Sequence, residues 1–152
     1  MAHKAIALLI ILAAALGLRF VNLTSWPIFA DESIYIRWSQ VMRAEPSLRF
    51  LPLSDGKQPL YMWATIPFLK IFSDPLLAGR VFSALAGLGT IAGIAAASFI
   101  LFKSPRQTLT ATAVAAVLPY TVFFNRLALA DSLLAMFLIW PFVFSLLSFI
   151  HH

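Results

Sequence analysis

Residues 26–61 read WPIFADESIYIRWSQVMRAEPSLRFLPLSDGKQPLY and form a polar segment in a chain that is otherwise largely hydrocarbon. Charged side chains are costly in lipid unless they are paired or hydrated. A membrane chain that gathers its charges in one segment between spans therefore uses that segment for chemistry or recognition. The segment holds four acidic and four basic residues: Asp31, Glu32, Glu45, Asp55, Arg37, Arg43, Arg49 and Lys57.

The composition outside this segment is typical of a polytopic membrane protein. Hydrophobic residues make up 61% of the 152 residues, charged residues only 11%, and the mean hydropathy is +0.90. The chain has no cysteine, which excludes disulfides, thiolate metal sites and thiol nucleophiles. The net charge of +5 does not indicate nucleic-acid binding, because the basic residues alternate with apolar stretches and form no soluble basic face.

The apolar stretches predict an all-α membrane protein, a single transmembrane domain with about four transmembrane helices and a large first extracytoplasmic loop. In the first helix, Arg19 is expected to reach toward the interface, where Trp26 would anchor the end. A cleaved signal peptide is the alternative for this stretch, given its short apolar run and the small residues at 13–15. The expected spans are residues 5–24, 76–102, 108–124 and 132–150, and the loop is 25–75.

Two amphipathic or interfacial helices are predicted within the loop. Residues 31–45 have apolar side chains at helical spacings and end before Pro46. Residues 59–72 are strongly apolar but too short to span a bilayer, and they contain Pro67. Gly89 and Gly93, in GxxxG spacing, predict close helix packing in the second span.

The positive-inside rule places the amino terminus with Lys4, the basic loop 103–107 and the carboxyl terminus in the cytoplasm. The polar segment, the turn 125–131 and all six acidic residues then share the outer face. The outer loop also carries more cations than the cytoplasmic side. Either the topology is inverted, or these cations are retained because they bind something anionic.

Several polar residues are candidates for a site, and each has an ordinary alternative. Asp31 is a candidate general base toward a hydroxyl, or a helix cap. Asp131, at the outer mouth of the fourth span, has the same two interpretations. Lys57 lies between Gly56 and a proline and either presents to a phosphate or is a snorkelling interfacial lysine. Arg80 and Arg126 share this ambiguity.

The chain resembles the amino-terminal part of GT-C type glycosyltransferases, in the branch of the protein O-mannosyltransferases and lipid A aminoarabinose transferases. The resemblance covers nearly the whole chain. Its motifs are Arg19 at the end of the first helix, P-x-x-x-DE-x-x-Y at Pro27, Asp31, Glu32 and Tyr35, K-x-P-L-Y-x-W at Lys57 to Trp63, D-P-x-x-x-x-R ending at Arg80, and R-x-A-L-x-D-S at Arg126 to Ser132.

The resemblance implies an inverting transfer of a sugar from a polyprenyl phosphate, dolichyl or undecaprenyl, to a hydroxyl on a protein, lipid or glycan at the outer or lumenal membrane face. The membrane would be a prokaryotic plasma membrane or the endoplasmic reticulum. Asp31 would be the base, and Lys57 would contact the carrier phosphate and stabilise its leaving charge. The other implied site residues are Glu32 and Asp131 as carboxylates, and Tyr35, Tyr61, Arg80 and Arg126 on the substrate.

No firm metal site is predicted, because relatives often have an acidic residue or histidine directly before the lysine, where this chain has Gly56; a divalent cation stays open. Relatives also have many more spans, so we expect the chain to be the amino-terminal portion of a larger catalytic core, with additional helices or subunits as partners. A noncatalytic membrane module that binds an anionic polyprenyl lipid and assembles partners through Gly89 and Gly93 is the main alternative. A small transporter or channel subunit is the third hypothesis, for which ionisable residues inside spans are expected.

Overall fold

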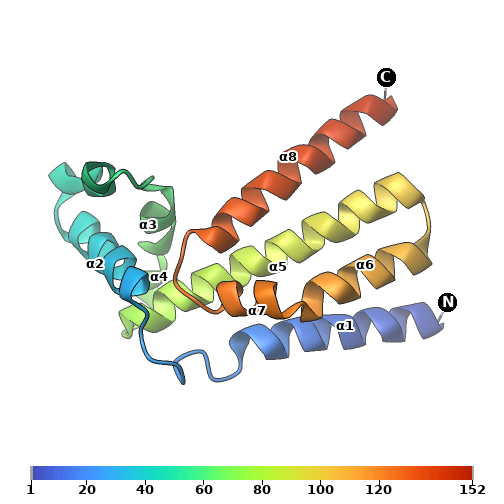
Figure 1. Ribbon diagram of the computed structural model, residues 1–152, viewed down its shortest axis with the longest axis horizontal. Coiled ribbons are helices and arrows are strands. Elements are labelled where there is room, and N and C mark those ends of the chain that lie inside the picture. Colours follow the sequence, from blue (N-terminus) through green and yellow to red (C-terminus); the bar gives the residue numbers. More distant parts are fainter. Residues whose placement is uncertain (1, 152) are drawn as a thin grey trace.

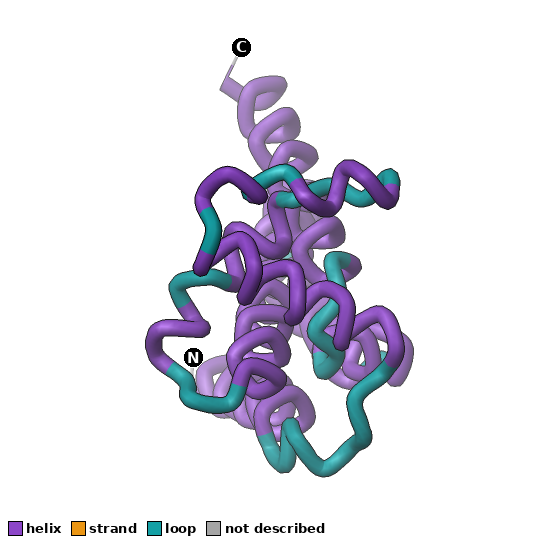
Figure 2. The backbone as a smooth tube through the Cα atoms, turned by 90° about the vertical axis from the view of Figure 1, so that its left-hand side faces the viewer, coloured by secondary structure: helices purple, strands orange, loops and turns teal. Residues whose placement is uncertain are grey.

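A computed structural model describes residues 2–151, and every regular element in that range is helical (Figures 1 and 2). The α-helices are α1 (Ala2–Phe20), α2 (Ala30–Ala44), α3 (Leu60–Thr65), α4 (Phe68–Ile71), α5 (Pro75–Phe102), α6 (Pro105–Val117), α7 (Pro119–Asn125) and α8 (Asp131–His151). Two short 3-10 helices, η1 (Pro46–Leu48) and η2 (Leu51–Asp55), lie between α2 and α3.

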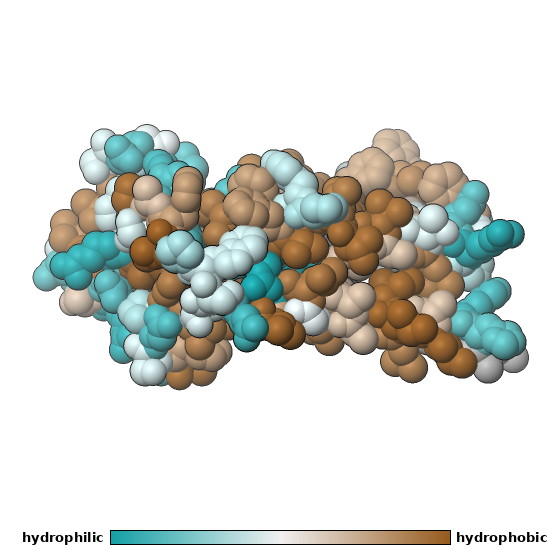
Figure 3. Space-filling view, turned by 60° about the horizontal axis from the view of Figure 1, so that its bottom comes forward, coloured by the Kyte–Doolittle hydropathy of each residue, from teal (hydrophilic) through white to brown (hydrophobic). Residues whose placement is uncertain are grey.

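The long helix α5 runs through the middle of the molecule, with α8 on one side and α6 and α1 on the other (Figure 1). The two termini lie at one end of this bundle, and α2, α3 and α4 form a cap at the other end. Hydrophilic side chains gather at the two ends, and hydrophobic ones dominate much of the surface between them (Figure 3). This arrangement agrees with the predicted grouping of the amino terminus, the 103–107 loop and the carboxyl terminus at one end.

Two helices are long and apolar enough to cross a membrane, namely α5 and α8. A third crossing is present if α6 and α7 together count as one bent span. The structure thus supports an all-helical membrane protein, with two to three helices that could cross the membrane. The apolar part of α1, Ile6–Phe20, is shorter than a typical span of about 20 residues. The predicted span 5–24 therefore stays a prediction.

The stretch predicted as the third span, 108–124, is bent, because the helix breaks after Val117 and the two pieces meet at 57°. Leu118 adopts an extended ψ of 119°, as expected for a residue directly before a proline. Pro119 has no N–H, so the carbonyl of Ala115 loses its usual helical donor.

Arg19 supplies hydrogen-bond donors to the carbonyls at this break. The expectation that its side chain snorkels to the interface is wrong. Its side chain is fully buried, and its guanidinium donates to the carbonyl oxygens of Ala116 at 2.8 Å and Ala115 at 3.3 Å. It also donates to the Asn125 amide oxygen at 2.9 Å. A cation at the carboxyl end of α6 complements the helix dipole while it satisfies these carbonyls.

The loop helices follow the sequence in one case and depart from it in the other. The helix predicted at 31–45 is confirmed as α2. The helix predicted at 59–72 is interrupted at residues 66–67, where Pro67 divides it into α3 and α4. The segment between α2 and α3 contains the two 3-10 helices.

Gly89 and Gly93 let α8 approach α5 closely, as the GxxxG spacing predicted. A Cβ at Gly89 would stand 2.6 Å from the Met136 sulfur, and one at Gly93 would stand 2.6 Å from a methyl carbon of Ile139. The Trp140 indole N–H donates to the Gly89 carbonyl at 3.1 Å. These glycines are thus occupied by the chain's own α8, which contradicts the idea that they assemble partner helices.

Candidate functional site

Asp31 and Lys57 form an ion pair at the capped end of the bundle. Asp31 lies in the first turn of α2, and Lys57 follows Gly56, which caps the end of η2 with a left-handed φ of 68°. The Lys57 Nζ lies 3.5 Å from the Asp31 Oδ1 and 5.0 Å from the centre of the Tyr35 ring. The lysine and aspartate side chains are 31% and 48% exposed, so both groups are accessible to a ligand.

The surroundings keep the lysine charged. Desolvation is the largest single influence on Lys57 and lowers its pKa, but Tyr35, Asp31 and Asp55 together outweigh it, so the pKa lies above its ordinary value of 10.5. The side chain is therefore a cation at neutral pH. A cation next to a carboxylate can exchange that partner for a phosphate of a ligand, which would release the carboxylate.

A cavity of about 430 Å³ opens beside this ion pair. Tyr35, Lys57 and Tyr61 line it from the cap, and Leu133, Leu134 and Phe137 line it from the first turns of α8. Leu134 and Phe137 are at least half exposed, so the apolar wall of the cavity continues onto the surface of α8 that would face lipid. The cavity thus combines a charged mouth with a hydrocarbon wall, which suits an anionic amphiphile.

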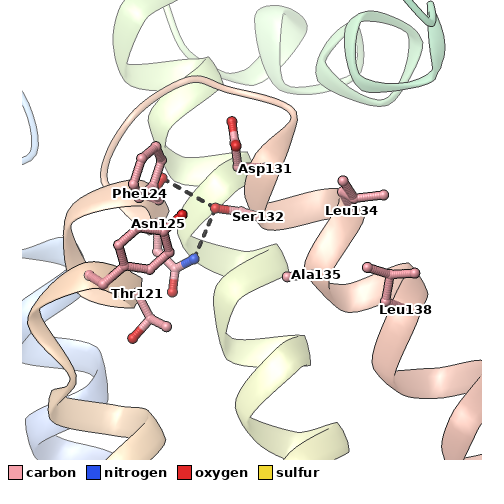
Figure 4. A pocket seen from close by; sticks show the side chains of 9 residues that line it. Thr121, Phe124, Asn125, Asp131, Ser132, Leu134, Ala135 and Leu138 are labelled. Carbon is pink, nitrogen blue, oxygen red and sulfur yellow. Dashed lines mark hydrogen bonds between the residues drawn. The ribbon is translucent and has the colours of Figure 1, made fainter.

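Asp131 lies next to this cavity, in a smaller one of about 240 Å³ that shares Leu134 with it. In Figure 4 its carboxylate points away from Asn125 and stands apart from the hydrogen bonds there. Those bonds run from the Asn125 amide to the Ser132 hydroxyl at 2.9 Å, and from that hydroxyl to the Phe124 carbonyl at 3.2 Å. Asp131 is therefore exposed at the start of α8, while its neighbour Ser132 links the start of α8 to the end of α7.

Glu32 and Arg80 form a second ion pair that is fully buried. The Arg80 Nε donates to one carboxylate oxygen at 2.8 Å and Nη2 donates to the other at 2.7 Å. The remaining guanidinium N–H groups donate to the carbonyls of Leu23, Trp26 and Pro27. All five donors of the arginine are thus satisfied.

The Glu32 carboxylate also accepts two backbone N–H groups, from Phe29 at 2.9 Å and from Ala128 at 2.7 Å. Burial raises the pKa of this carboxyl group, but the bonds from Arg80, Ala128 and Phe29 outweigh it and hold the pKa below 4.5. Through Ala128, the glutamate ties the start of α2 to the loop that leads into α8. Asp31 and Asp131 are thereby held at the same end of the molecule.

This network separates the predicted site residues into a buried structural pair, Glu32 and Arg80, and an accessible pair, Asp31 and Lys57. Glu32, not Asp31, binds the free N–H at the start of α2, so the alternative of Asp31 as a cap has no support in its contacts. Glu32 and Arg80 are brought together with each other and lie beneath the surface that Asp31 and Lys57 share.

Tyr61 and Arg126 are partly engaged elsewhere. The Tyr61 hydroxyl donates to the Gly79 carbonyl at 3.1 Å or shares a bond with Ser83 at 2.9 Å, and only its ring contributes to the cavity. Arg126 donates to the carbonyls of Leu18 and Asn22 and lies over the Trp26 ring, away from the Lys57 cavity. Of the eight predicted site residues, Asp31, Lys57, Tyr35 and the ring of Tyr61 meet at one cavity, and Asp131 lies beside it.

Sequence reasoning missed Gln58, Leu133 and Phe137, which line the cavity, and Asn125, which joins Arg19 to Ser132. Asn125 packs against Gly87, where a Cβ would stand 2.2 Å from its amide oxygen, but only the folded structure brings the two residues together. No local pattern in the sequence pointed to the apolar members.

Among the side chains that the structure describes, no group of three histidine, aspartate or glutamate residues converges as metal ligands would. Comparisons of the chain with protein-family models, curated proteins and solved structures found no match. The functional conclusion therefore depends on the geometry of the site.

Proposed function

We propose that this chain forms the donor site of a membrane glycosyltransferase that moves a sugar from a polyprenyl phosphate to a hydroxyl acceptor, with inversion at the anomeric carbon. The observation that carries the proposal is the Asp31–Lys57 pair at the mouth of an apolar cavity that opens along α8. The isoprenoid would lie against Leu134 and Phe137, and the phosphate would lie at the lysine.

In the proposed reaction, Asp31 accepts the proton of the acceptor hydroxyl as its oxygen attacks the anomeric carbon. The bond between that carbon and the phosphate oxygen breaks, and the polyprenyl phosphate leaves with the bonding electron pair. Lys57 neutralises the charge that develops on this leaving phosphate, a role that a fixed cation performs well in a poorly hydrated site. Asp131, beside the cavity, would orient the acceptor.

Binding of undecaprenyl phosphate, compared with undecaprenol, tests the donor site in detergent micelles. We expect the wild-type chain to prefer the phosphate form, and Lys57→Ala to lose that preference. Lys103→Ala at the opposite end is the matched control and should leave binding unchanged. Equal affinity of the wild type for the phosphate and the alcohol would contradict the donor site.

Turnover of radiolabelled undecaprenyl-phosphate sugar, with membrane lipid and peptide acceptors, tests the chemistry. Asp31→Asn should keep carrier binding but slow transfer by about 100-fold or more, because general-base catalysis contributes about 10²–10⁴-fold. Carrier binding without any transfer, in both wild type and Asp31→Asn, would favour the noncatalytic lipid-binding module instead.

A further inference from the structure

A third cavity, of about 530 Å³, lies in the cap on the other side of α3 from the Lys57 cavity. It is lined by three cations, Arg43, Arg49 and Lys70, and by Phe50, Trp63 and Ile66 among others. It shares no lining residue with the Lys57 cavity. Tyr61 and Trp63 are two positions apart on α3, so they face roughly opposite directions, one toward each cavity. We call this third space the basic cavity.

The three cations of the basic cavity are not neutralised by the part of the chain that the structure describes. The two ion pairs there are Asp31–Lys57 and Glu32–Arg80, and neither involves the basic cavity. The carboxylates closest in sequence are engaged elsewhere: Glu45 accepts from the Ser47 side chain and backbone, and Asp74 accepts from the Leu76 N–H. Three exposed cations around one hollow therefore attract an anion.

The walls of the basic cavity are held by specific contacts. The Arg43 Nη1 donates to the Leu69 carbonyl at 2.5 Å, which ties α2 to α4. The Trp63 indole N–H donates to the Arg49 carbonyl at 2.7 Å, which ties α3 to the segment between η1 and η2. The rings of Trp63 and Phe50 meet edge to face at 5.3 Å. The hollow is thus a built feature with an aromatic wall.

We infer that the basic cavity binds the phosphodiester headgroup of an anionic membrane phospholipid. Two guanidinium groups and an ammonium match phosphate oxygens in charge and in hydrogen-bond donors. The aromatic and aliphatic walls match the glycerol and upper acyl region, because tryptophan side chains favour the level of the headgroups. The inference is independent of the proposed glycosyl transfer, and it accounts for the cations that the outer loop carries against the positive-inside rule.

The test uses the full chain in neutral detergent, with phosphatidylglycerol or phosphatidylcholine added and bound lipid counted by native mass spectrometry. The variant Arg43→Gln/Arg49→Gln/Lys70→Gln removes the charge of the basic cavity. The matched control, Lys4→Gln/Lys103→Gln/Arg106→Gln, removes three charges at the opposite end. Lys70→Gln alone changes an exposed side chain without a hydrogen bond to the described chain, so it serves where the triple variant fails to fold.

We expect the wild type to retain phosphatidylglycerol in preference to phosphatidylcholine. The basic-cavity triple variant should lose about 10-fold or more in that affinity, since each cation near an anionic lipid surface contributes about fivefold. The control triple variant should stay within about twofold. Equal losses in both triple variants, no loss in either, or full displacement of the lipid by equimolar inorganic phosphate would overturn the assignment.

Discussion

Replacing Glu32 by glutamine should destabilise this protein far more than the same kind of change at its neighbour Asp31. The Glu32 carboxylate is fully buried and accepts four hydrogen bonds, two from Arg80 and two from backbone N–H groups. Glutamine has almost the same shape, but its amide nitrogen would meet donors where the carboxylate oxygen accepted them. It would also leave the Arg80 charge buried without its counter-ion.

The size of the effect follows from this loss. Removing one partner of a buried ion pair costs about 3–5 kcal/mol. A loss of 1 kcal/mol shifts the unfolding midpoint by about 2–4 °C at this chain length, so Glu32→Gln should lower the midpoint by about 6–20 °C. Asp31→Asn removes a half-exposed partner, for which about 0–1 kcal/mol is typical, and should shift it by at most a few degrees.

Thermal unfolding in detergent, followed by tryptophan fluorescence, measures both variants. A double replacement, Glu32→Leu with Arg80→Met, should not recover the loss, because it leaves the N–H groups of Phe29 and Ala128 and the carbonyls of Leu23, Trp26 and Pro27 without their partners. Equal midpoints for Glu32→Gln and Asp31→Asn would refute the reasoning. So would a double variant as stable as the wild type.

Three further outcomes are expected. The folded protein holds the pKa of Glu32 below 4.5, so the stabilisation from its charge is complete above pH 4.5 and is lost on acidification below it. The unfolding midpoint of the wild type should therefore fall as the pH drops below 4.5. The Glu32 contribution to this pH dependence should be absent in Glu32→Gln. Arg19→Met should cost about 1–3 kcal/mol in unfolding free energy, because it leaves the buried Ala116 carbonyl without its donor and the Ala115 carbonyl with only the Thr121 hydroxyl; an unchanged midpoint would contradict this role of Arg19. Single cysteines at Ser54 and Ser104 should react with an impermeant thiol reagent from opposite faces of the membrane, and labelling of both from one face would contradict the arrangement of the two ends.

The two carboxylates at the start of α2 show how much of the site the sequence could predict. It indicated that Asp31, Lys57 and Tyr35 belong to one polar segment, and their meeting in the structure follows from short separations along the chain. It did not distinguish Asp31 from Glu32, because adjacent acidic residues in one helical turn have the same local signals. The partners that separate them, Arg80 and Ala128, are 48 and 96 residues away from Glu32.

The sequence by itself determined the helical class, the long apolar helices α5 and α8, the amphipathic helix α2 and the grouping of all acidic residues at one end. These features depend on composition, length and periodicity, which are local. Only the tertiary structure decided which charges are buried and which are free to bind. Arg19 is buried against the carbonyl end of α6, Arg80 is buried in an ion pair with Glu32, and Lys57 stays accessible beside Asp31. The physical reason is that the state of a charge depends on desolvation and on partners brought in by distant segments, and no local pattern of residues specifies either.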